Sequence, residues 1–246
     1  MPRETKEQRR KRARRLLGRL ERLYPEADCE LEHRSPYELL ISTILSAQTT
    51  DKAVNRVTPE LFRRYPTTER LALADTEAVE SLISSIGLYR NKAKAIVGAA
   101  REIVTRFGGR VPGDRVGLES LPGVGRKTAN VVLPNAFGVP GLAVDTHVAR
   151  LSRRLGLSRE TDPKKIEQDL TALFSPRRWG FVSHALIWHG RRVCDARRPR
   201  CEACRLADAC PSAGAADAAP ARRRAKGART ASRRMGSARR ETGRSR

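Results

Sequence analysis

The 246-residue chain is long enough to form one large domain or two smaller ones. Its 50 Lys and Arg residues against 27 Asp and Glu residues give a formal net charge of +23, which indicates a polyanionic partner. No apolar run approaches the roughly 18 residues needed to span a bilayer, so we expect a cytoplasmic protein without a membrane partner.

The basic excess is concentrated at the two ends of the chain. We expect residues 1–15 to form a basic, disordered arm. Residues 212–246 are mostly Ala, Arg, Gly and Ser and offer little to bury, so we expect a disordered tail there as well. Such a tail either strengthens non-specific DNA binding or only keeps the protein in solution.

Helix signals are dense along the chain, and strand signals are nearly absent. Residues 35–38, Ser-Pro-Tyr-Glu, read as a capping box with Pro at the first helical position, ahead of the apolar run 39–45. Further caps and apolar stripes predict helices over residues 51–64, 75–86, 91–107 and 162–174. The fold class is therefore all-α.

A helix, Gly turn, helix pattern occurs twice, at residues 85–93 and 121–129. In the second copy, Gly123 and Gly125 permit a tight turn that leaves N–H groups open at the start of the next helix. Such a helix start binds a DNA phosphate without reading a base, although a plain structural turn is the alternative. Pro134 falls inside that next helix and removes one hydrogen bond, so we expect a bend or shortening after Asn130.

Two candidate catalytic residues lie near this hairpin. Lys127 directly follows the turn, where the positive end of a helix dipole favours the neutral amine that a nucleophile requires. Asp145 lies 18 residues later and is either a helix cap or a carboxylate that assists the lysine.

Four cysteines near the C-terminal end follow the spacing C-x6-C-x2-C-x5-C: Cys194, Cys201, Cys204 and Cys210. The short segment predicts a metal centre. Structural zinc sites usually pair two short Cys knuckles, so the single knuckle here favours a [4Fe–4S] cluster over zinc. Arginines around the loop either form a phosphate-facing surface or offset the negative charge of the cluster itself. We interpret Cys29, His184 and His189 as packed residues without chemistry.

Residues 16–211 resemble endonuclease III, the bifunctional pyrimidine-lesion glycosylase of the helix-hairpin-helix superfamily. The resemblance rests on residues 45–51, 86–89, 121–130 and 144–147 and on the cysteine spacing. It implies a two-lobed helix-hairpin-helix DNA glycosylase fold with a C-terminal iron–sulfur cluster loop. The cluster lobe would comprise residues 16–29 and 140–211. The helical-barrel lobe would comprise residues 30–139, with the hairpin at about 115–134.

The resemblance also implies a role for each site residue. Lys127 would displace the damaged base and form a Schiff base with Asp145 assisting, and β-elimination would then cut 3′ of the abasic site. Leu88 would wedge into the base stack and Gln48 would fill the gap. The expected DNA contacts are Gln48, Leu88, Gly123, Val124, Gly125, Arg126, His147 and Arg191. The four cysteines would hold the [4Fe–4S] cluster. The partner would be duplex DNA with damaged bases or abasic sites, bound by a nucleoid-associated monomer.

Two other functions compete with this one. The adenine-mismatch glycosylase branch has the hairpin and cluster but lacks the lysine, and it uses a Glu in a helix that here reads Ile-Ser-Thr-Ile-Leu over residues 41–45. A non-catalytic DNA-binding module is the second alternative. The presence of Lys127 and the absence of that Glu disfavour the first alternative, and the presence of both Lys127 and Asp145 disfavours the second.

Overall fold

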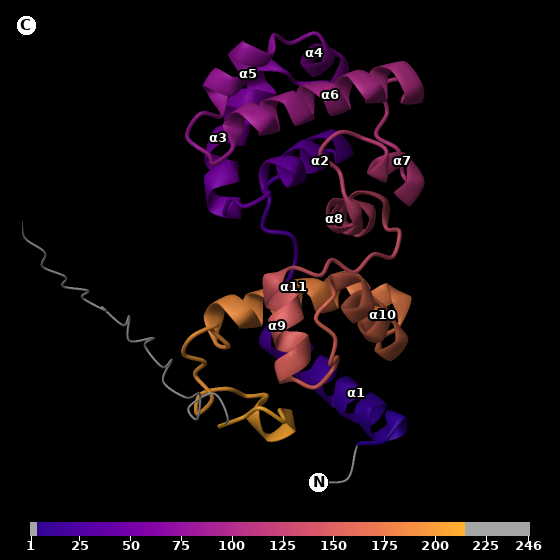
Figure 1. Cartoon of the computed structure of the whole chain (residues 1–246), viewed down its shortest axis with the longest axis vertical. Helices are drawn as coiled ribbons and strands as arrows, with labels where there is room; N and C mark the ends of the chain where they lie inside the picture. The colour runs from indigo at the N-terminus through magenta and orange to yellow at the C-terminus, as the bar shows by residue number, and fades with distance from the viewer. Residues whose placement is uncertain (1–3, 215–246) are drawn as a thin grey trace, which may run out of the picture.

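A computed structural model describes residues 4–214, and within that range every regular element is a helix, which confirms the all-α class. Two groups of helices are stacked end to end (Figure 1). The barrel lobe contains α2 (Pro36–Leu45), α3 (Asp51–Arg64), α4 (Thr68–Ala72), α5 (Thr76–Leu82), α6 (Tyr89–Phe107), α7 (Arg115–Glu119) and α8 (Arg126–Phe137). The cysteine lobe contains α1 (Lys6–Leu23), α9 (Thr146–Arg154), α10 (Pro163–Leu173), α11 (Trp179–Arg192), the short 3-10 turns η1 (Pro176–Arg178) and η2 (Ala207–Ala209), and the cysteine loop.

Each lobe has its own hydrophobic core. The core of the barrel lobe is drawn from residues 31–133, and that of the cysteine lobe from residues 13–27 and 142–209. Helix α2 runs through the middle of the barrel lobe and is buried at every position from Tyr37 to Leu45. The chain crosses between the lobes twice, at residues 24–35 and 138–145, so both connections pass the junction between the cores.

Most predicted helices exist, with shifted ends. Helix α2 begins after Ser35, whose hydroxyl accepts a hydrogen bond from the Glu38 N–H. Only this half of the expected capping box forms, because the Glu38 carboxylate accepts from the Arg34 N–H instead of the Ser35 N–H. Helix α3 is capped by Thr50 and not by Asp51. The segment predicted to reach Ile86 stops at Leu82. Glycine and capping residues locate helix ends only to within a few residues, because neighbouring residues compete for the same cap.

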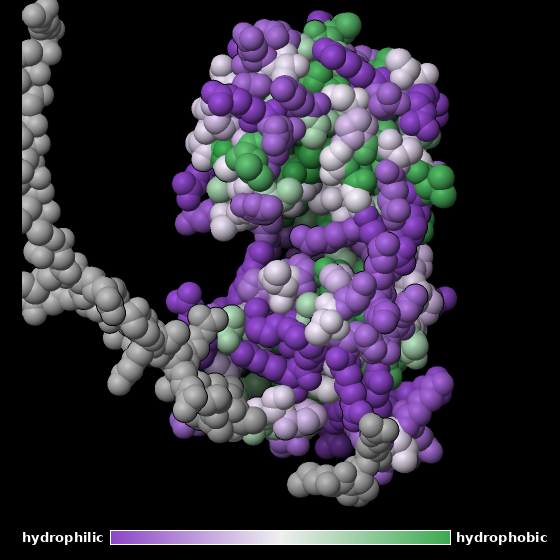
Figure 2. Space-filling view, viewed as in Figure 1, coloured by the Kyte–Doolittle hydropathy of each residue, from purple (hydrophilic) through white to green (hydrophobic). Residues whose placement is uncertain are grey.

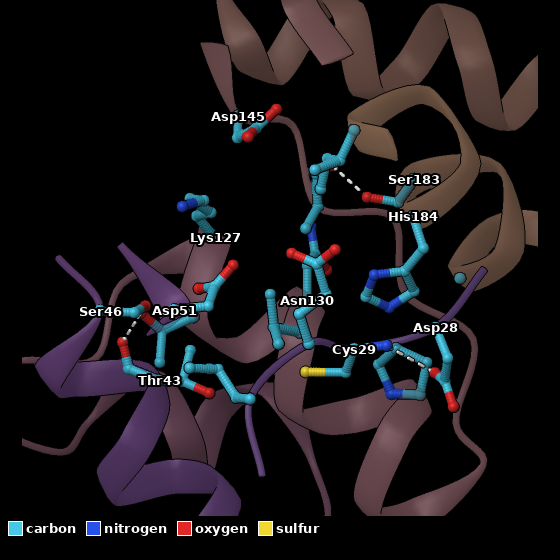
Figure 3. A pocket seen from close by; sticks show the side chains of 18 of the residues that line it. Asp28, Cys29, Thr43, Ser46, Asp51, Lys127, Asn130, Asp145, Ser183 and His184 are labelled. Atoms are coloured by element: carbon cyan, nitrogen blue, oxygen red, sulfur yellow. Dashed lines mark hydrogen bonds between the residues drawn. The ribbon is translucent and has the colours of Figure 1, made fainter. Parts of the chain in front are cut away.

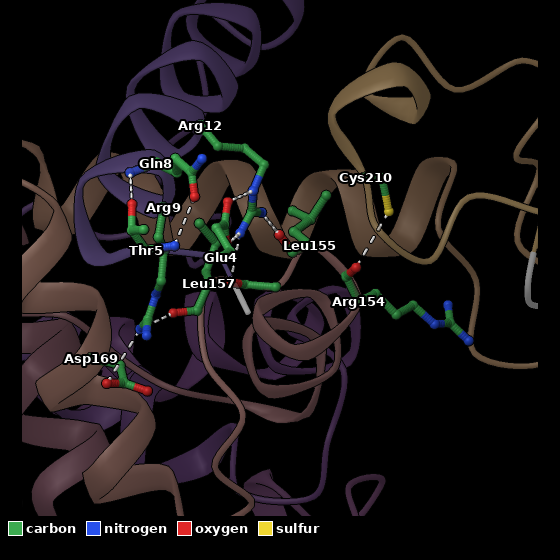
Figure 4. A network of polar contacts seen from close by, with 11 residues as sticks. Glu4, Thr5, Gln8, Arg9, Arg12, Arg154, Leu155, Leu157, Asp169 and Cys210 are labelled. Carbon is green, nitrogen blue, oxygen red and sulfur yellow. Dashed lines mark hydrogen bonds and ion pairs between the residues drawn. The ribbon is translucent and has the colours of Figure 1, made fainter. Parts of the chain in front are cut away.

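The expectation of a disordered arm over residues 1–15 is wrong for residues 6–15, which belong to α1. A capping box begins the helix: Thr5 accepts from the Gln8 N–H, and the Gln8 side chain accepts from the Thr5 N–H. Two of its arginines then bind carbonyl groups of the α9–α10 connection (Figure 4). Arg12 donates to Leu155 and Gly156, and Arg9 donates to Leu157. Basic charge suggested a solvated arm, but these guanidinium groups hold α1 against the lobe.

Pro134 lies within α8, yet the helix is not shortened and continues to Phe137. The Asn135 side chain donates to the Val131 carbonyl at 2.7 Å, which adds a hydrogen bond beside the one that proline removes. The pyrrolidine ring also fits against glycines: a Cβ at Gly180 would lie 3.5 Å from the Pro134 ring, and one at Gly141 would lie 3.0 Å from it. Close packing of neighbouring segments therefore accompanies the proline.

Hydrophilic side chains cover most of the face in Figure 2, and the surface is indented where the lobes meet. Within residues 4–214, no helix is long and apolar enough to cross a membrane. Apart from residues 212–214, the predicted tail lies outside the described residues.

Candidate functional site

A cavity of about 210 Å³ lies at the junction of the lobes. Both candidate catalytic residues line it, Lys127 from the barrel lobe and Asp145 from the connection into the cysteine lobe (Figure 3). Other walls come from the first connection, from α2 and from α11: Asp28, Cys29, Thr43, Ser46, Asp51, Ser183, His184 and Arg191. The chain thus brings together two residues 18 positions apart and places polar groups around them.

Lys127 occupies the second position of α8 and is solvent exposed. The hairpin places Lys127 here, because α8 begins directly after Gly125. Gly125 has no side chain, so no side-chain hydrogen bond caps the first N–H groups of α8. A Cβ at Gly125 would meet nothing within 4 Å, so an incoming group can approach the helix start closely. The amine therefore lies beside N–H groups and a helix dipole that suit a phosphate or another anion.

Asp145 is the N-cap of α9, and its Oδ1 accepts a hydrogen bond from the Val148 N–H at 2.7 Å. This contact fixes the side chain at the cavity wall. The cap interpretation of Asp145 is therefore confirmed, and because the same carboxylate lies in the cavity wall, its role beside Lys127 stays a prediction.

Gln48 and Leu88 share an unusual backbone conformation. Their φ angles are +53° and +59°, and they are the non-glycine residues with positive φ within residues 4–214. Gln48 is exposed, and Leu88 is 54% exposed although its side chain is apolar. Left-handed backbone costs a non-glycine residue about 1–2 kcal/mol, and such strain is concentrated at functional positions. Both residues were selected from the sequence as DNA-inserting groups.

The residues of the hairpin differ in whether their backbone can still bind an anion. Gly123 has φ +77°, and a Cβ there would lie 2.9 Å from that of Ala95, so the turn admits only glycine without rearrangement. Val124 is buried, and its N–H already donates to Leu121. Gly125 remains open. The anion-accepting part of the hairpin is therefore the start of α8.

Two arginines expected to contact DNA are bound to carboxylates. Arg126 forms a bidentate pair with Glu167 of α10, with N···O distances of 2.8 and 2.9 Å. Arg191 of α11 binds Asp51 at 2.9 Å and also Glu30. The Arg126–Glu167 pair joins the barrel lobe to the cysteine lobe. Arg191, in the cysteine lobe, binds Asp51 of the barrel lobe and Glu30 of the connection between the lobes. Their guanidinium groups have structural partners that sequence inspection could not reveal.

His147 is half-buried, and its ring lies against α11. A Cβ at Gly190 would come within 2.9 Å of its Nδ1, and Arg150 lies 3.1 Å from the same atom. Burial lowers the pKa of His147, with Arg150 acting in the same direction and Asp145 opposing it. The close approach of α9 to α11 thus depends on a glycine.

The four cysteines of the loop line a second cavity, between α9, α11 and residues 199–213. Arg154 donates to the Cys194 sulfur at 3.3 Å, and the Leu206 N–H donates to the Cys204 sulfur at 3.4 Å. Within residues 4–214, no three His, Cys, Asp or Glu side chains are arranged to hold a single metal ion. The four cysteines thus share the lining of one cavity.

His189 was expected to be a packed residue, and it is 2% exposed, but it also contacts the cysteine loop. Its Nε2 lies 3.4 Å from the Cys204 sulfur, and its Nδ1 lies 2.9 Å from the Tyr24 hydroxyl. Burial lowers its pKa to about 4. Only the tertiary structure places this ring between α1 and the loop, since the three residues are far apart in sequence.

Sequence reasoning also missed one wall of the inter-lobe cavity. Cys29 and His184 both line it (Figure 3). Burial raises the pKa of the Cys29 thiol to about 11 and lowers the pKa of His184, so both are neutral near pH 7. Neutral polar groups of this kind suit contact with an uncharged ligand such as a base.

Comparison with known proteins supports this geometry. Residues 41–176 match the HhH-GPD superfamily of base excision DNA repair proteins. Endonuclease III of Synechocystis sp. is 54% identical over 205 residues, covering 83% of this chain and 94% of the relative.

Two solved structures resemble the fold closely. A non-covalent endonuclease III–DNA complex has a TM-score of 0.82 and 43% identity, covering 85% of this chain and 99% of that one. A trapped endonuclease III–DNA covalent intermediate has a TM-score of 0.80 and 43% identity, covering 84% and 97%.

Proposed function

This chain belongs to the endonuclease III family, and from that membership we propose how its residues divide the work of a DNA glycosylase that also cleaves the strand. The protein is a base excision DNA glycosylase with AP lyase activity. The observation that supports the residue roles best is that Lys127 and Asp145 line one cavity at the junction of the lobes.

Lys127 acts as the nucleophile. Its neutral amine attacks C1′ of the deoxyribose, the C1′–N bond breaks, and the bonding electrons leave with the base. Asp145 stabilises positive charge on the sugar and accepts the proton that the amine releases. The C1′–O4′ bond of the resulting aminal then breaks as O4′ takes up a proton, which opens the sugar ring and gives the imine. Loss of a C2′ proton expels the 3′ phosphate as the C3′–O bond breaks, and water hydrolyses the imine to free the lysine.

Gln48 and Leu88 hold the duplex open around the extruded nucleotide. Leu88 presents an exposed apolar side chain, and Gln48 presents an amide that can pair with the orphaned base. Inserting such groups offsets the cost of unstacking. The start of α8 at Gly125 binds the DNA backbone. Arg126, His147 and Arg191 also face DNA in this proposal, with the two arginines exchanging carboxylates for phosphates.

The cysteine loop holds a [4Fe–4S] cluster through Cys194, Cys201, Cys204 and Cys210. Four cysteines around one cavity supply the four thiolates that a [4Fe–4S] cluster takes, and their spacing, with a single short knuckle, favours the cluster over zinc. The N–H donors of Arg154 and Leu206 near two sulfurs also fit thiolates. The bound cluster would cross-link the loop to the lobe and present its arginines.

The substrate class in this proposal is an oxidised or otherwise damaged pyrimidine in duplex DNA, or an abasic site. Neutral Cys29 and His184 in the cavity wall suit an uncharged base. In this proposal the protein works as a monomer bound to the nucleoid in the cytoplasm, and membership of a DNA repair family supports its action on DNA.

Borohydride trapping tests the central role. A duplex with one thymine glycol is incubated with wild type or Lys127→Ala, and borohydride is added to reduce any imine. We expect a covalent adduct and strand cleavage with wild type alone, while both proteins bind the duplex. Wild-type-like nicking by Lys127→Ala would refute the lysine mechanism. Base loss without an adduct in wild type would instead indicate water as the nucleophile and a monofunctional enzyme.

A further inference from the structure

Lys92 is a buried lysine outside the catalytic cavity. It is 5% exposed, on the first turn of α6 after the Leu88 turn. Burial lowers the pKa of its amine, and it pairs with no carboxylate of the described residues. Burying an ammonium group without an ionic partner is costly, so its retention calls for a compensating role.

The amine of Lys92 reaches the turn that carries Gln48. Its Nζ donates to the Thr49 hydroxyl at 2.5 Å. The same hydroxyl lies 3.4 Å from the Ala47 carbonyl, to which it can donate in turn. The Thr49 N–H closes the turn by donating to Ser46 at 3.0 Å. Residues 47 and 49 are therefore both held, and strained Gln48 projects from between them.

The backbone of Lys92 holds the other strained turn. Its N–H donates to the Leu88 carbonyl at 3.0 Å, which is the first hydrogen bond of α6. Leu88 has φ +59° and serves as the helix cap with no side-chain cap bond. One residue thus contacts both segments whose backbones adopt positive φ, through its amide on one side and its amine on the other.

We propose that Lys92 is a positioning residue that locks the Gln48 and Leu88 turns in a fixed relation, so that both enter the duplex together when the damaged nucleotide leaves the stack. This inference rests on the proposed insertion roles of Gln48 and Leu88. Two mobile turns would lose conformational entropy when they became ordered during insertion. Turns that are already ordered avoid that cost. Lys92 does not line the catalytic cavity, so it touches neither the sugar nor the base.

The test separates base extrusion from chemistry. Lys92→Met keeps the length of the side chain and removes its donors, and Thr49→Val removes the acceptor while keeping its shape. Thr49→Ser retains the hydroxyl and is the matched control. We expect single-turnover excision from a thymine glycol duplex to fall about tenfold in Lys92→Met and Thr49→Val, to fall no further in the double variant, and to stay near wild type in Thr49→Ser.

Two further measurements distinguish this role from simple stabilisation. Cleavage of a single-stranded abasic oligonucleotide needs no extrusion, so Lys92→Met should match wild type there. In a Lys127→Ala background, a 2-aminopurine next to the lesion should brighten more slowly when Lys92 is also replaced. Equal losses on duplex and single strand, or additive effects of Lys92→Met and Thr49→Val, would overturn the proposal.

Borohydride trapping distinguishes failure of the proposed mechanism from failure of the positioning role. If wild type itself forms no borohydride adduct, the proposed mechanism fails before the role of Lys92 is reached. If an adduct persists in Lys127→Ala and peptide mapping places it on Lys92, the residue is a second nucleophile and the positioning role is wrong.

Discussion

The two lobes are stabilised in different ways. Within residues 4–214, the barrel lobe has 28 buried hydrophobic residues in its core and the cysteine lobe has 19, so the cysteine lobe depends more on polar contacts. Arg12 donates to carbonyls of residues 155 and 156, and Arg154 donates to those of residues 195 and 196. Basic residues that look like a DNA-binding surface in the sequence thus also satisfy backbone groups in the fold.

The difference predicts that losing the proposed cluster should unfold the cysteine lobe far more than the barrel lobe. In Cys204→Ala, we expect loss of iron and of DNA affinity, with amide exchange accelerating throughout α9, α11 and the loop. A structural metal centre can contribute most of the folding energy of a small core. Amides of α2 and α6 should stay protected because their core contains no cysteine of the loop.

Hydrogen-exchange mass spectrometry measures this contrast. Cys29→Ser is the matched control, because Cys29 lies outside the loop and its replacement should leave iron content and exchange unchanged. Uniform exchange across both lobes in Cys204→Ala would show that they form one cooperative unit.

Removing the same side chain from each core sharpens the comparison. Leu40 and Leu16 are both fully buried, one in each lobe. Leu→Ala at either position should lower the free energy of unfolding by about 2–5 kcal/mol, because it removes buried methyl groups and leaves a cavity. Urea unfolding measures the loss. Leu16→Ala should also speed the release of iron to a chelator, whereas an equal effect from Leu40→Ala would contradict separate cores.

Pro134→Ala should stabilise the protein. The alanine N–H can bond to the Asn130 carbonyl, which proline leaves without its helical donor, and the gain is at most about 3 kcal/mol. Thermal unfolding measures it. A lower unfolding temperature would mean that the ring's packing against Gly141 and Gly180 outweighs the missing hydrogen bond.

The smallest expected effect concerns pH and the end of α1. The hydrogen bond from Arg12 is the largest influence on Glu4 and lowers the pKa of its carboxyl below the usual value. Since the folded pKa is depressed, this contribution to stability is present above the unfolded pKa and is lost as the pH falls through the folded one. Wild type should therefore exceed Glu4→Gln in stability near pH 6, and the difference should shrink as the pH falls below 4.5, the ordinary pKa of the carboxyl. If the stability difference between wild type and Glu4→Gln persisted in acid, it would come from packing and not from the charge of the carboxylate.

Several features could be predicted from local sequence alone. The Ser35 cap, the turn glycines Gly123 and Gly125, and the cysteine spacing each depend on a few adjacent residues, because caps and turns are set by nearby backbone geometry. Helix type was predictable for the same reason, whereas α5 ends before, and α6 begins before, the predicted residue.

Only the tertiary structure decided which distant groups meet. It brings Lys127 and Asp145 to one cavity, pairs Arg126 with Glu167, and places His189 between Tyr24 and Cys204. It also orders α1, whose charge suggested an arm without structure. A guanidinium group looks the same in the sequence whether it faces solvent, a carbonyl or a phosphate, and its partner is fixed only when the chain folds back on itself.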